Sequence, residues 1–324
     1  MKANNNIELR LWEYGSDGSK IESFLESASL AHNIPQKSEA WFRWKFEQSP
    51  YGQAILACAF DGDRVVGCVA MGMGMMTFGE TQIKCALSYE TFVHPQYQGL
   101  QIFTKLTKLA EDSCKDRGVK MLYNFPNSNS LRGFIKRDWI KTEISKYKIK
   151  VTNIWRFARY IRDIRKPFVS LASNLDKISN IDIRQFSTTS KEGVFIPQWS
   201  SEYLKWRFHT YPVGHYWVYE DGNTYAIARI GCRGDLKQAE ILHIQSYHKA
   251  LSRKDWRVIC NRLIKETKVD FIGLAASDAH PISAYTKVFI PVPSRSNFTY
   301  KKLSDDIQFD TFQMCKSDID AHTY

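Results

Sequence analysis

A glycine-containing turn at the start of a helix is the clearest chemical feature of the sequence. The stretch YETFVHPQYQGLQIFTKL, residues 89–106, reads as a strand that ends near His94, a short loop with Gly99, and an amphipathic helix. Backbone N–H groups at such a turn have no partner within the helix, and the helix dipole adds positive potential beside them. The segment from Gln98 to Phe103 is therefore a candidate pyrophosphate site.

The elements that must position this turn follow a regular order. The hydrophobic spacing predicts helices at residues 22–31, 39–48 and about 100–117, and strands near 54–60, 64–76 and 81–93. The segments VKMLYNF, SNSLRGFIKRDW and EISKYKIKV then predict a strand, a short helix and a strand that closes the first half.

The chain also repeats itself. The stretch SEAWFRWKFEQSPYG at residues 38–52 recurs as SSEYLKWRFHTYPVG at residues 200–214, a constant offset of 162 residues. A repeat of this length has the size of one domain, which indicates a duplication. The second half follows the same outline with a helix at about 252–267, a later helix near HPISAYTKVF and a final strand NFTYKKL. It contains no loop like the one at Gly99, so we expect it to be structural or acceptor-binding.

Composition limits the class of protein. The 324 residues and 44% hydrophobic content suit two domains. No signal peptide or membrane-spanning run is evident, and the seven scattered cysteines fit reduced thiols better than disulfides or a zinc site. We therefore expect a cytoplasmic protein without a metal. The formal charge of +11 favours anionic partners.

Positive charge is concentrated between Lys141 and Lys166, where nine basic residues meet only Glu143 and Asp163. One interpretation is a solvated face on a connecting segment. The other is a surface that steers a polyanionic substrate.

The order of these motifs resembles the GNAT superfamily of acyl-CoA-dependent N-acyltransferases. Its motif A reads (Q/R)xxGx(G/A), and NFPNSNSLRGFIKRDW at residues 124–139 is similar to the segment after the fifth strand in one GNAT subgroup. The resemblance covers about residues 38–150. It implies an α+β fold of two tandem GNAT-like domains, each a mixed, mostly antiparallel twisted sheet flanked by helices.

The resemblance also implies that backbone amides of the turn hold the pyrophosphate of coenzyme A. With Gln98 read as the first motif residue, Gln101 and Phe103 depart from the small residues of the pattern. An amide N–H of the fourth strand, near Phe92 or Val93, would stabilise the oxyanion of direct acyl transfer. The residues expected to contact acyl-CoA are Phe92, Val93, Gln98, Gly99, Leu100, Gln101, Phe103, Asn127 and Asn129.

Within the same resemblance, Glu90 is the first candidate for the base that accepts the ammonium proton, and His94 is the second. No tyrosine occurs between Asn124 and Ile144 to serve as the usual acid, and Ser130 lies in that region. The candidates for substrate binding are Arg43, Lys45 and Tyr123. Trp44 and Phe46 recur in the second half, which favours packing roles for them.

The leading hypothesis is an N-acyltransferase that moves an acetyl or hydroxybutyryl group from acyl-CoA, its co-substrate, to a nucleotide-linked amino sugar for polysaccharide assembly. Its predicted parts are a GNAT domain at 1–155, a linker at 156–180 and a degenerate GNAT-like domain at 181–324. Nucleic acid is not an expected partner, and no feature indicates an oligomeric state. The alternatives are a peptidyl-transferase that uses aminoacyl-tRNA and a non-catalytic protein that binds coenzyme A.

Overall fold

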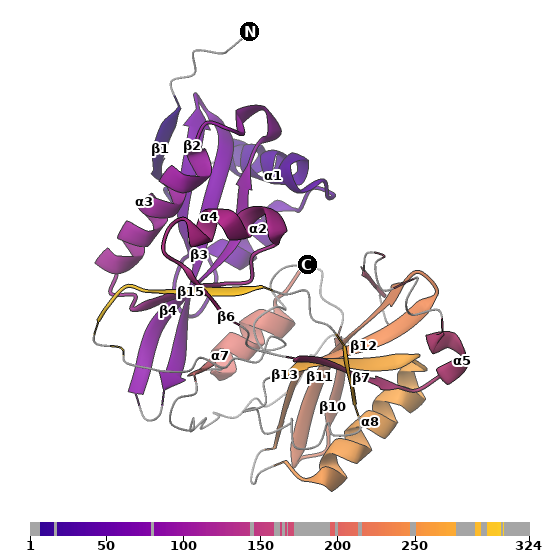
Figure 1. Cartoon of the computed structure of the whole chain (residues 1–324). Helices are drawn as coiled ribbons and strands as arrows, with labels where there is room; N and C mark the ends of the chain where they lie inside the picture. Colours follow the sequence, from indigo (N-terminus) through magenta and orange to yellow (C-terminus); the bar gives the residue numbers. More distant parts are fainter. Residues whose placement is uncertain are drawn as a thin grey trace.

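The computed structural model describes residues 7–15, 18–78, 81–142, 146–158, 163, 166, 168–171, 195–197, 200–212, 216–246, 251–276, 289–292, 297–305 and 307. These residues form two β-sheets flanked by helices (Figure 1). Each sheet is mixed and mostly antiparallel, which confirms the predicted fold class. None of the described helices is long and apolar enough to cross a membrane.

The first sheet has the strand order β1-β2-β3-β4-β5-β15-β6, and β9 pairs with β3. Only β4 and β5 pair in parallel among its described strands. The strands are β1 (Glu8–Leu11), β2 (Ile55–Asp61), β3 (Arg64–Phe78), β4 (Thr81–Val93), β5 (Met121–Asn124), β6 (Ile140–Thr142), β9 (Phe195–Pro197) and β15 (Phe298–Lys302).

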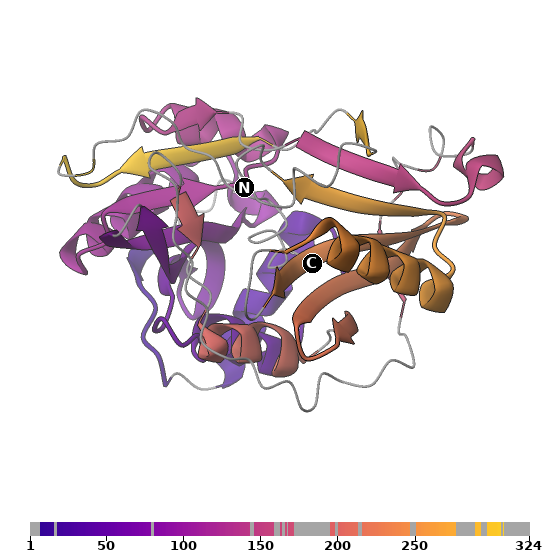
Figure 2. The same cartoon turned by 90° about the horizontal axis from the view of Figure 1, so that it is seen from below.

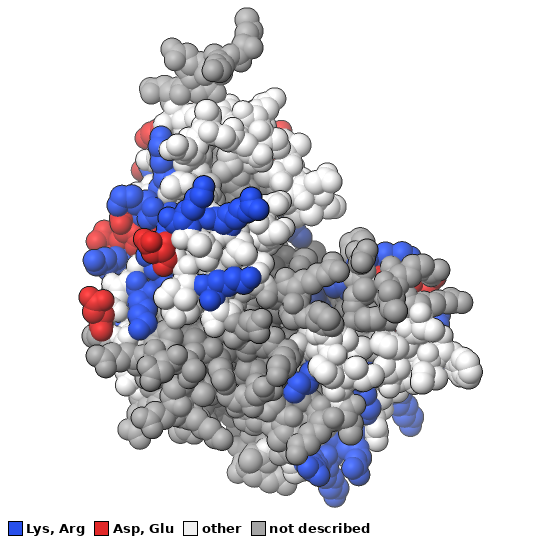
Figure 3. All heavy atoms as spheres, viewed as in Figure 1, with Lys and Arg blue, Asp and Glu red and all other residues white. Residues whose placement is uncertain are grey.

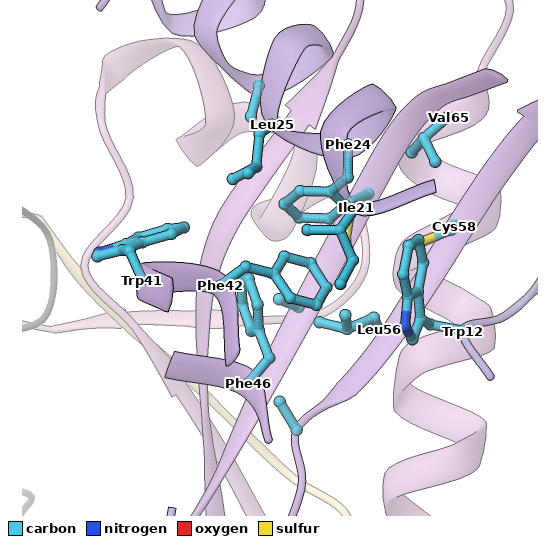
Figure 4. Close-up of a cluster of buried hydrophobic side chains, with 14 of the residues drawn as sticks. Trp12, Ile21, Phe24, Leu25, Trp41, Phe42, Phe46, Leu56, Cys58 and Val65 are labelled. Carbon is cyan, nitrogen blue, oxygen red and sulfur yellow. The ribbon is translucent and has the colours of Figure 1, made fainter. Parts of the chain in front are cut away.

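Two pairs of helices cover the two faces of this sheet. Helices α1 (Gly18–His32) and α2 (Glu39–Phe46) pack on one face, and α3 (Ile102–Asp116) and α4 (Ser128–Ile135) on the other. The short helix η1 (Pro95–Tyr97) joins β4 to α3. Successive side chains of a strand point to opposite faces, so alternate residues of β2 belong to the two cores. The α1 and α2 core is rich in aromatic rings (Figure 4).

The second sheet has the strand order β10-β11-β12-β13-β7-β14, and β8 pairs with β11. Helix α8 packs on it through its buried face. The strands are β7 (Lys146–Val151), β8 (Val169–Ser170), β10 (Tyr216–Glu220), β11 (Thr224–Arg233), β12 (Leu236–Ser246), β13 (Phe271–Ala276) and β14 (Ile290–Val292). The helices are α5 (Ile154–Phe157), α7 (Ser201–Leu204), η2 (Lys205–His209) and α8 (Arg253–Thr267).

The two halves exchange a strand. β7, predicted to close the first sheet, pairs instead with β13 and β14 of the second. β15, predicted as the last strand of the second half, lies between β5 and β6 of the first sheet. Figure 2 shows the yellow β15 and the magenta β7 in the two different sheets. The hydrophobic pattern predicts each strand but not its partner, and the exchange ties the two halves together.

The duplicated tryptophans meet where the halves join. Trp44 and Trp206 stack with ring centroids 4.9 Å apart and planes 16° from parallel. Each indole Nε1–H donates to the backbone carbonyl oxygen of the other residue at 2.9 Å. Both side chains are buried. The two tryptophans are therefore packing residues, as their recurrence predicted.

The domain limits at 155 and 181 remain a prediction. The predicted linker at 156–180 includes residues 159–162, 164, 165, 167 and 172–180, which lie outside the described part of the chain, as does most of the predicted helix near 280–289. The basic stretch at 141–166 connects β6 of the first sheet to β7 of the second.

Candidate active site

The site begins where β4 and β5 separate. Their parallel pairing ends at the level of Ser88 and Asn124, although β4 continues to Val93. Beyond Ser88, no strand of the described chain pairs with the β5 side of β4. Its backbone groups on that side are therefore available to a ligand, since a strand edge presents unpaired N–H and C=O groups.

Glu90 occupies a β-bulge in this free part of β4. The pairing with β3 shifts register between Cys68 and Ala70, opposite Glu90. Glu90 has a φ of +44°, a left-handed conformation that non-glycine residues rarely adopt. Such strain is concentrated at functional sites, where the surrounding structure holds it. Here the bulge turns the carboxylate toward α2.

Lys45 of α2 holds that carboxylate. Its Nζ lies 2.7 Å from Glu90 Oε1, and the lysine side chain is only 1% exposed against 15% for Glu90. The rings of Trp41 and Tyr89 each have their centroid 4.8 Å from the ammonium. Burial lowers the pKa of Lys45, and the Glu90 carboxylate opposes this shift. Lys45 is therefore better placed to fix Glu90 than to bind a substrate directly.

The second half adds another buried cation beside this pair. Arg207 is 1% exposed, and its guanidinium lies 6.0 Å from the centroid of the Trp44 ring and 5.8 Å from that of Tyr211. Its Nη2 has no hydrogen-bond partner, and none of the described carboxylates forms an ion pair with it. The positive charge of Arg207 also lowers the pKa of Lys45, after the larger effect of burial. Arg207 thus lies close enough to Lys45 to act on its charge, beside the Lys45–Glu90 pair.

The backbone distinguishes the two candidate oxyanion donors. His94 donates its N–H to Val66 O on β3 at 2.9 Å. Because N–H directions alternate along a strand, the Phe92 N–H also faces β3, whereas the Val93 N–H faces the open side. The Val93 carbonyl on that side accepts a bond from Gln98 Nε2 at 3.3 Å. Val93 is therefore the better candidate for the oxyanion donor.

The turn that follows uses two left-handed residues, Gly99 with a φ of +84° and Gln101 with a φ of +59°. They are spaced like the two small residues of motif A. The backbone therefore favours a motif that starts at Gln96, two residues earlier than the sequence reading, with Gln101 as its one departure. The sequence reading missed Gln96 because it took Gln98 as the first motif residue.

The start of α3 is open to a ligand. Gln101 is its N-cap but makes no capping hydrogen bond with its side chain. The first bond of the helix runs from Lys105 N to Gln101 O, so the N–H groups of the first three helical residues have no partner within the helix. Residues 98–101 are exposed. Figure 3 shows Lys and Arg gathered on the face that carries α3 and α4, which favours an anion.

The second half closes the corresponding helix start with its own side chains. Ser252 and Asp255 form a capping box at the N-terminus of α8, in which each side chain accepts a bond from the other's backbone N–H. The acidic Asp255 also disfavours an anion there. The geometry agrees with the expectation that only the first half keeps a phosphate turn.

We predict opposite effects at the two left-handed positions of the turn. Gly99→Val places a β-branched residue at a φ of +84° and should weaken coenzyme A binding at least about tenfold. Gln101→Gly should leave binding unchanged or tighten it, because glycine adopts a positive φ without strain. Calorimetric titration with coenzyme A measures both.

Gly118→Val is the matched control for the turn variants. Gly118 lies at the other end of α3 with a φ of +72°. At both Gly118 and Gly99, no heavy atom of the described residues lies within 4 Å of the position that a Cβ would take. This variant should cost similar stability without changing the affinity for coenzyme A. The reverse ranking of the variants at 99 and 101 would contradict the assignment of the turn.

His94, the second candidate base, is buried and occupied by local contacts. Gln96 donates its backbone N–H to Nδ1 at 3.3 Å, and Arg64 Nη2 lies 3.1 Å from Nε2. Burial lowers the pKa of His94, and the Arg64 guanidinium lowers it further. Because donors face both ring nitrogens, the contacts favour a structural role over proton transfer.

His94 should make the fold sensitive to acid. Its pKa in the folded state lies below the ordinary value of 6.5, so the unfolded chain binds the proton first. The neutral His94 ring makes its full contribution to the free energy of unfolding above pH 6.5. This contribution falls as the pH drops from 6.5 toward the pKa of the folded state. Urea unfolding at about pH 7.5 and about pH 5 should therefore show a smaller acid loss for His94→Gln than for wild type. If His94→Gln loses as much stability in acid as the wild type does, His94 is not the cause of the acid sensitivity. His32→Gln, at an exposed site, is the control.

The polar residues after β5 organise the start of α4. Asn127 is its N-cap, and Oδ1 accepts from the N–H groups of Asn129 at 3.0 Å and Ser130 at 2.9 Å. Ser130 Oγ lies 3.2 Å from the same oxygen. These contacts place the three residues beside the opening in a capping role, with Asn127 and Asn129 exposed.

The remaining candidates have different surroundings. Arg43 pairs with Glu39 and Glu47 along the surface of α2, so its charge is already compensated there. Phe103 packs against Phe134 of α4, with ring centroids 5.3 Å apart, and leaves only its backbone to the turn. Leu100 is 51% exposed. Tyr123 is buried on the face of β5 opposite α3, where burial raises its pKa well above the ordinary value.

Comparison with known proteins places this geometry in a family. A model of the GNAT acetyltransferase domain matches residues 17–137, which include β4, the bulge and the turn. The match to this domain lies within the first half and covers less than half of the chain. The enzyme is therefore an acyl-CoA-dependent N-acyltransferase, and the expectation of a GNAT fold is confirmed. No curated protein sequence matches the chain.

Solved structures resemble the enzyme across both halves. A GCN5-related N-acetyltransferase from Anabaena variabilis has a TM-score of 0.62 at 10% identity, with 92% of this chain and 73% of that chain covered. Eis1 from Mycobacterium abscessus has a TM-score of 0.56 at 13% identity, with 91% and 73% covered. A GCN5-related N-acetyltransferase from Kribbella flavida has a TM-score of 0.53 at 11% identity, with 92% and 71% covered. At these identities the likeness concerns the fold.

Proposed function

We propose that the enzyme transfers an acetyl or hydroxybutyryl group from acyl-CoA to the amine of a nucleotide-linked amino sugar, such as a dTDP-3-amino-3,6-dideoxyhexose. The observation that carries this proposal is the set of groups around Glu90 where the halves meet. The buried Lys45 ammonium pairs with Glu90 and has two aromatic rings beside it. Arg207 is a second buried cation, which comes from the other half and lies near Tyr211. A planar base suits the rings, and a diphosphate suits the excess positive charge.

The residues supply a direct transfer mechanism. The neutral amine attacks the thioester carbon, a C–N bond forms, and the C–S bond breaks to release the coenzyme A thiolate. The open Val93 N–H stabilises the oxyanion of the tetrahedral intermediate. Glu90 takes the ammonium proton, directly or through one water, and Lys45 keeps its carboxylate oriented. The thiolate takes a proton from solvent.

The open turn favours acyl-CoA over aminoacyl-tRNA as the donor, because the tandem enzymes that use tRNA lack a working pyrophosphate turn. The second half then serves the acceptor side through Arg207 and Tyr211, both near the Glu90 pair. Sequence reasoning missed both residues. The repeat contained the signal, since Arg207 is the counterpart of Lys45 162 residues later.

Thiol release tests the proposal. Purified enzyme with acetyl-CoA or 3-hydroxybutyryl-CoA and a panel of nucleotide amino sugars should release free thiol and yield an acylated product by mass spectrometry. The same nucleotide sugars with a hydroxyl in place of the amine are the control and should release none. No thiol above background with any amino sugar would exclude this class of acceptor.

A further inference from the structure

Three polar side chains lie in a row at the closed end of the β4–β5 opening. Ser88 of β4 is level with Asn124 of β5, and Asn124 is level with Thr299 of β15. Residues at the same level of neighbouring strands point to the same face of a sheet. The exposed fractions are 1% for Ser88, 7% for Asn124 and 0% for Thr299. The row is thus buried, with Asn124 as its most accessible member.

The row faces α3 and α4. Ala86 and Leu122, a paired level two residues earlier on the same strands, belong to the core that α3 covers. Phe298, next to Thr299, points the other way, into the core that contains Tyr123. The row therefore lies on the face of the sheet that α3 covers, and the candidate pyrophosphate turn is at the start of that helix.

Hydrogen bonds within the protein leave two members of this row unsatisfied. Ser88 Oγ and Thr299 Oγ1 are buried without a hydrogen-bond partner, as is Thr91 Oγ1 farther along β4. Buried hydroxyls nearly always have a partner, and leaving one unpaired is costly. Of the seven such side-chain atoms among the described residues, two lie on β4, which borders the opening, and Thr299 Oγ1 lies on β15, the strand beyond β5. This concentration points to a ligand that supplies the missing partners.

The exchanged strand supplies one third of the row. β15 comes from the far end of the chain and lies beside β5 through four paired residues. Asn297, just before it, donates from Nδ2 to Pro126 O at 3.3 Å and so fixes the strand to the loop after β5. The first half alone would lack Thr299. The strand exchange therefore adds the third residue of the row as well as joining the halves.

We propose that Ser88, Asn124 and Thr299 form a polar subsite for the transferred acyl group and select a chain that carries a hydroxyl. The inference rests on the proposed function, in which the Val93 N–H on the open side of β4 meets the thioester, so that the acyl group lies in the β4–β5 opening. The Ser88–Asn124 level is the innermost point of that opening, so the end of the acyl chain reaches it and the part common to all coenzyme A esters does not. A hydroxyl donates to and accepts from these groups, whereas an aliphatic chain would leave them unpaired.

The test is calorimetric titration with coenzyme A, butyryl-CoA and 3-hydroxybutyryl-CoA in the absence of any acceptor. Wild type should bind 3-hydroxybutyryl-CoA about tenfold more tightly than butyryl-CoA. Ser88→Ala with Thr299→Val should abolish that ratio and leave the affinity for coenzyme A unchanged. Thr224→Val is the matched control, because Thr224 Oγ1 is another buried hydroxyl without a partner and lies in the second sheet.

Two outcomes would overturn the subsite. Equal affinity of wild type for the two esters would mean that the row does not read the acyl chain. An equal loss of affinity for all three ligands in the double variant would assign the row to the shared part of coenzyme A. Because no acceptor is present, a failure of the amino-sugar assay leaves this result unaffected, and the two proposals fail separately.

Discussion

Replacing Glu90 by Gln is expected to lower the turnover number by a factor of about 10² to 10⁴, the usual contribution of a positioned general base. The amide keeps the size of the carboxylate but cannot accept the ammonium proton. The affinity for acyl-CoA should stay near the wild-type value, because the turn at Gly99 is unchanged. Steady-state kinetics and calorimetric titration measure the two quantities separately.

The stability of this variant needs its own control. Glu90→Gln leaves Lys45 as a buried cation without its carboxylate, which is strongly destabilising for most buried pairs. The double variant Glu90→Gln with Lys45→Met removes the orphaned charge and should recover stability but not turnover. Glu47→Gln, on the surface pair of α2, should leave both unchanged. Wild-type turnover in the double variant would remove Glu90 from the mechanism.

The second large effect is expected at the junction of the halves. Trp44→Ala or Trp206→Ala removes a buried indole, its stacking contact and the hydrogen bond that its Nε1–H donates, while the backbone carbonyl that accepts from the other indole remains. Each should lower the free energy of unfolding by about 3 to 5 kcal/mol, the usual range for a buried tryptophan. Urea unfolding of the single and double variants gives the values.

The double variant distinguishes a coupled pair from two separate core residues. Because the indoles contact each other directly, the two losses should be non-additive by about 0.5 to 3 kcal/mol. Trp155→Ala is the control, since that indole is 87% exposed, and it should change stability by no more than about 0.5 kcal/mol. Strict additivity of the Trp44 and Trp206 losses would contradict the reciprocal packing.

Local elements were predictable from the sequence because their signals are local. The strand predicted at 81–93 is β4 with the same limits, and the helix predicted at about 100–117 is α3 at 102–116. The hydrophobic periodicity and the turn residues at their ends determine such elements. The partners of β7 and β15 were not predictable, because hydrophobic alternation reveals that a strand has a buried face but not which sheet covers it.

The candidate active site likewise has parts that follow from the local sequence and parts that depend on long-range contacts. The turn at Gly99 could be proposed as a phosphate site from the local sequence, whereas Glu90 became a candidate base only through the resemblance to the GNAT family. The role of Lys45 could not, because its partner lies 45 residues away and is reached through a bulge with left-handed backbone. The contributions of Arg207 and Thr299 could not be inferred from the sequence either. Arg207 depends on the contact between the halves, and Thr299 on the exchanged strand.

We expect one acyl-CoA site per chain, at the open start of α3. The most direct measurement is calorimetric titration of the purified enzyme with coenzyme A, read for stoichiometry. One site per chain, weakened in Gly99→Val, is the predicted result, because Ser252 and Asp255 close the corresponding helix of the second half. Two sites per chain, or one site unaffected by Gly99→Val, would contradict it.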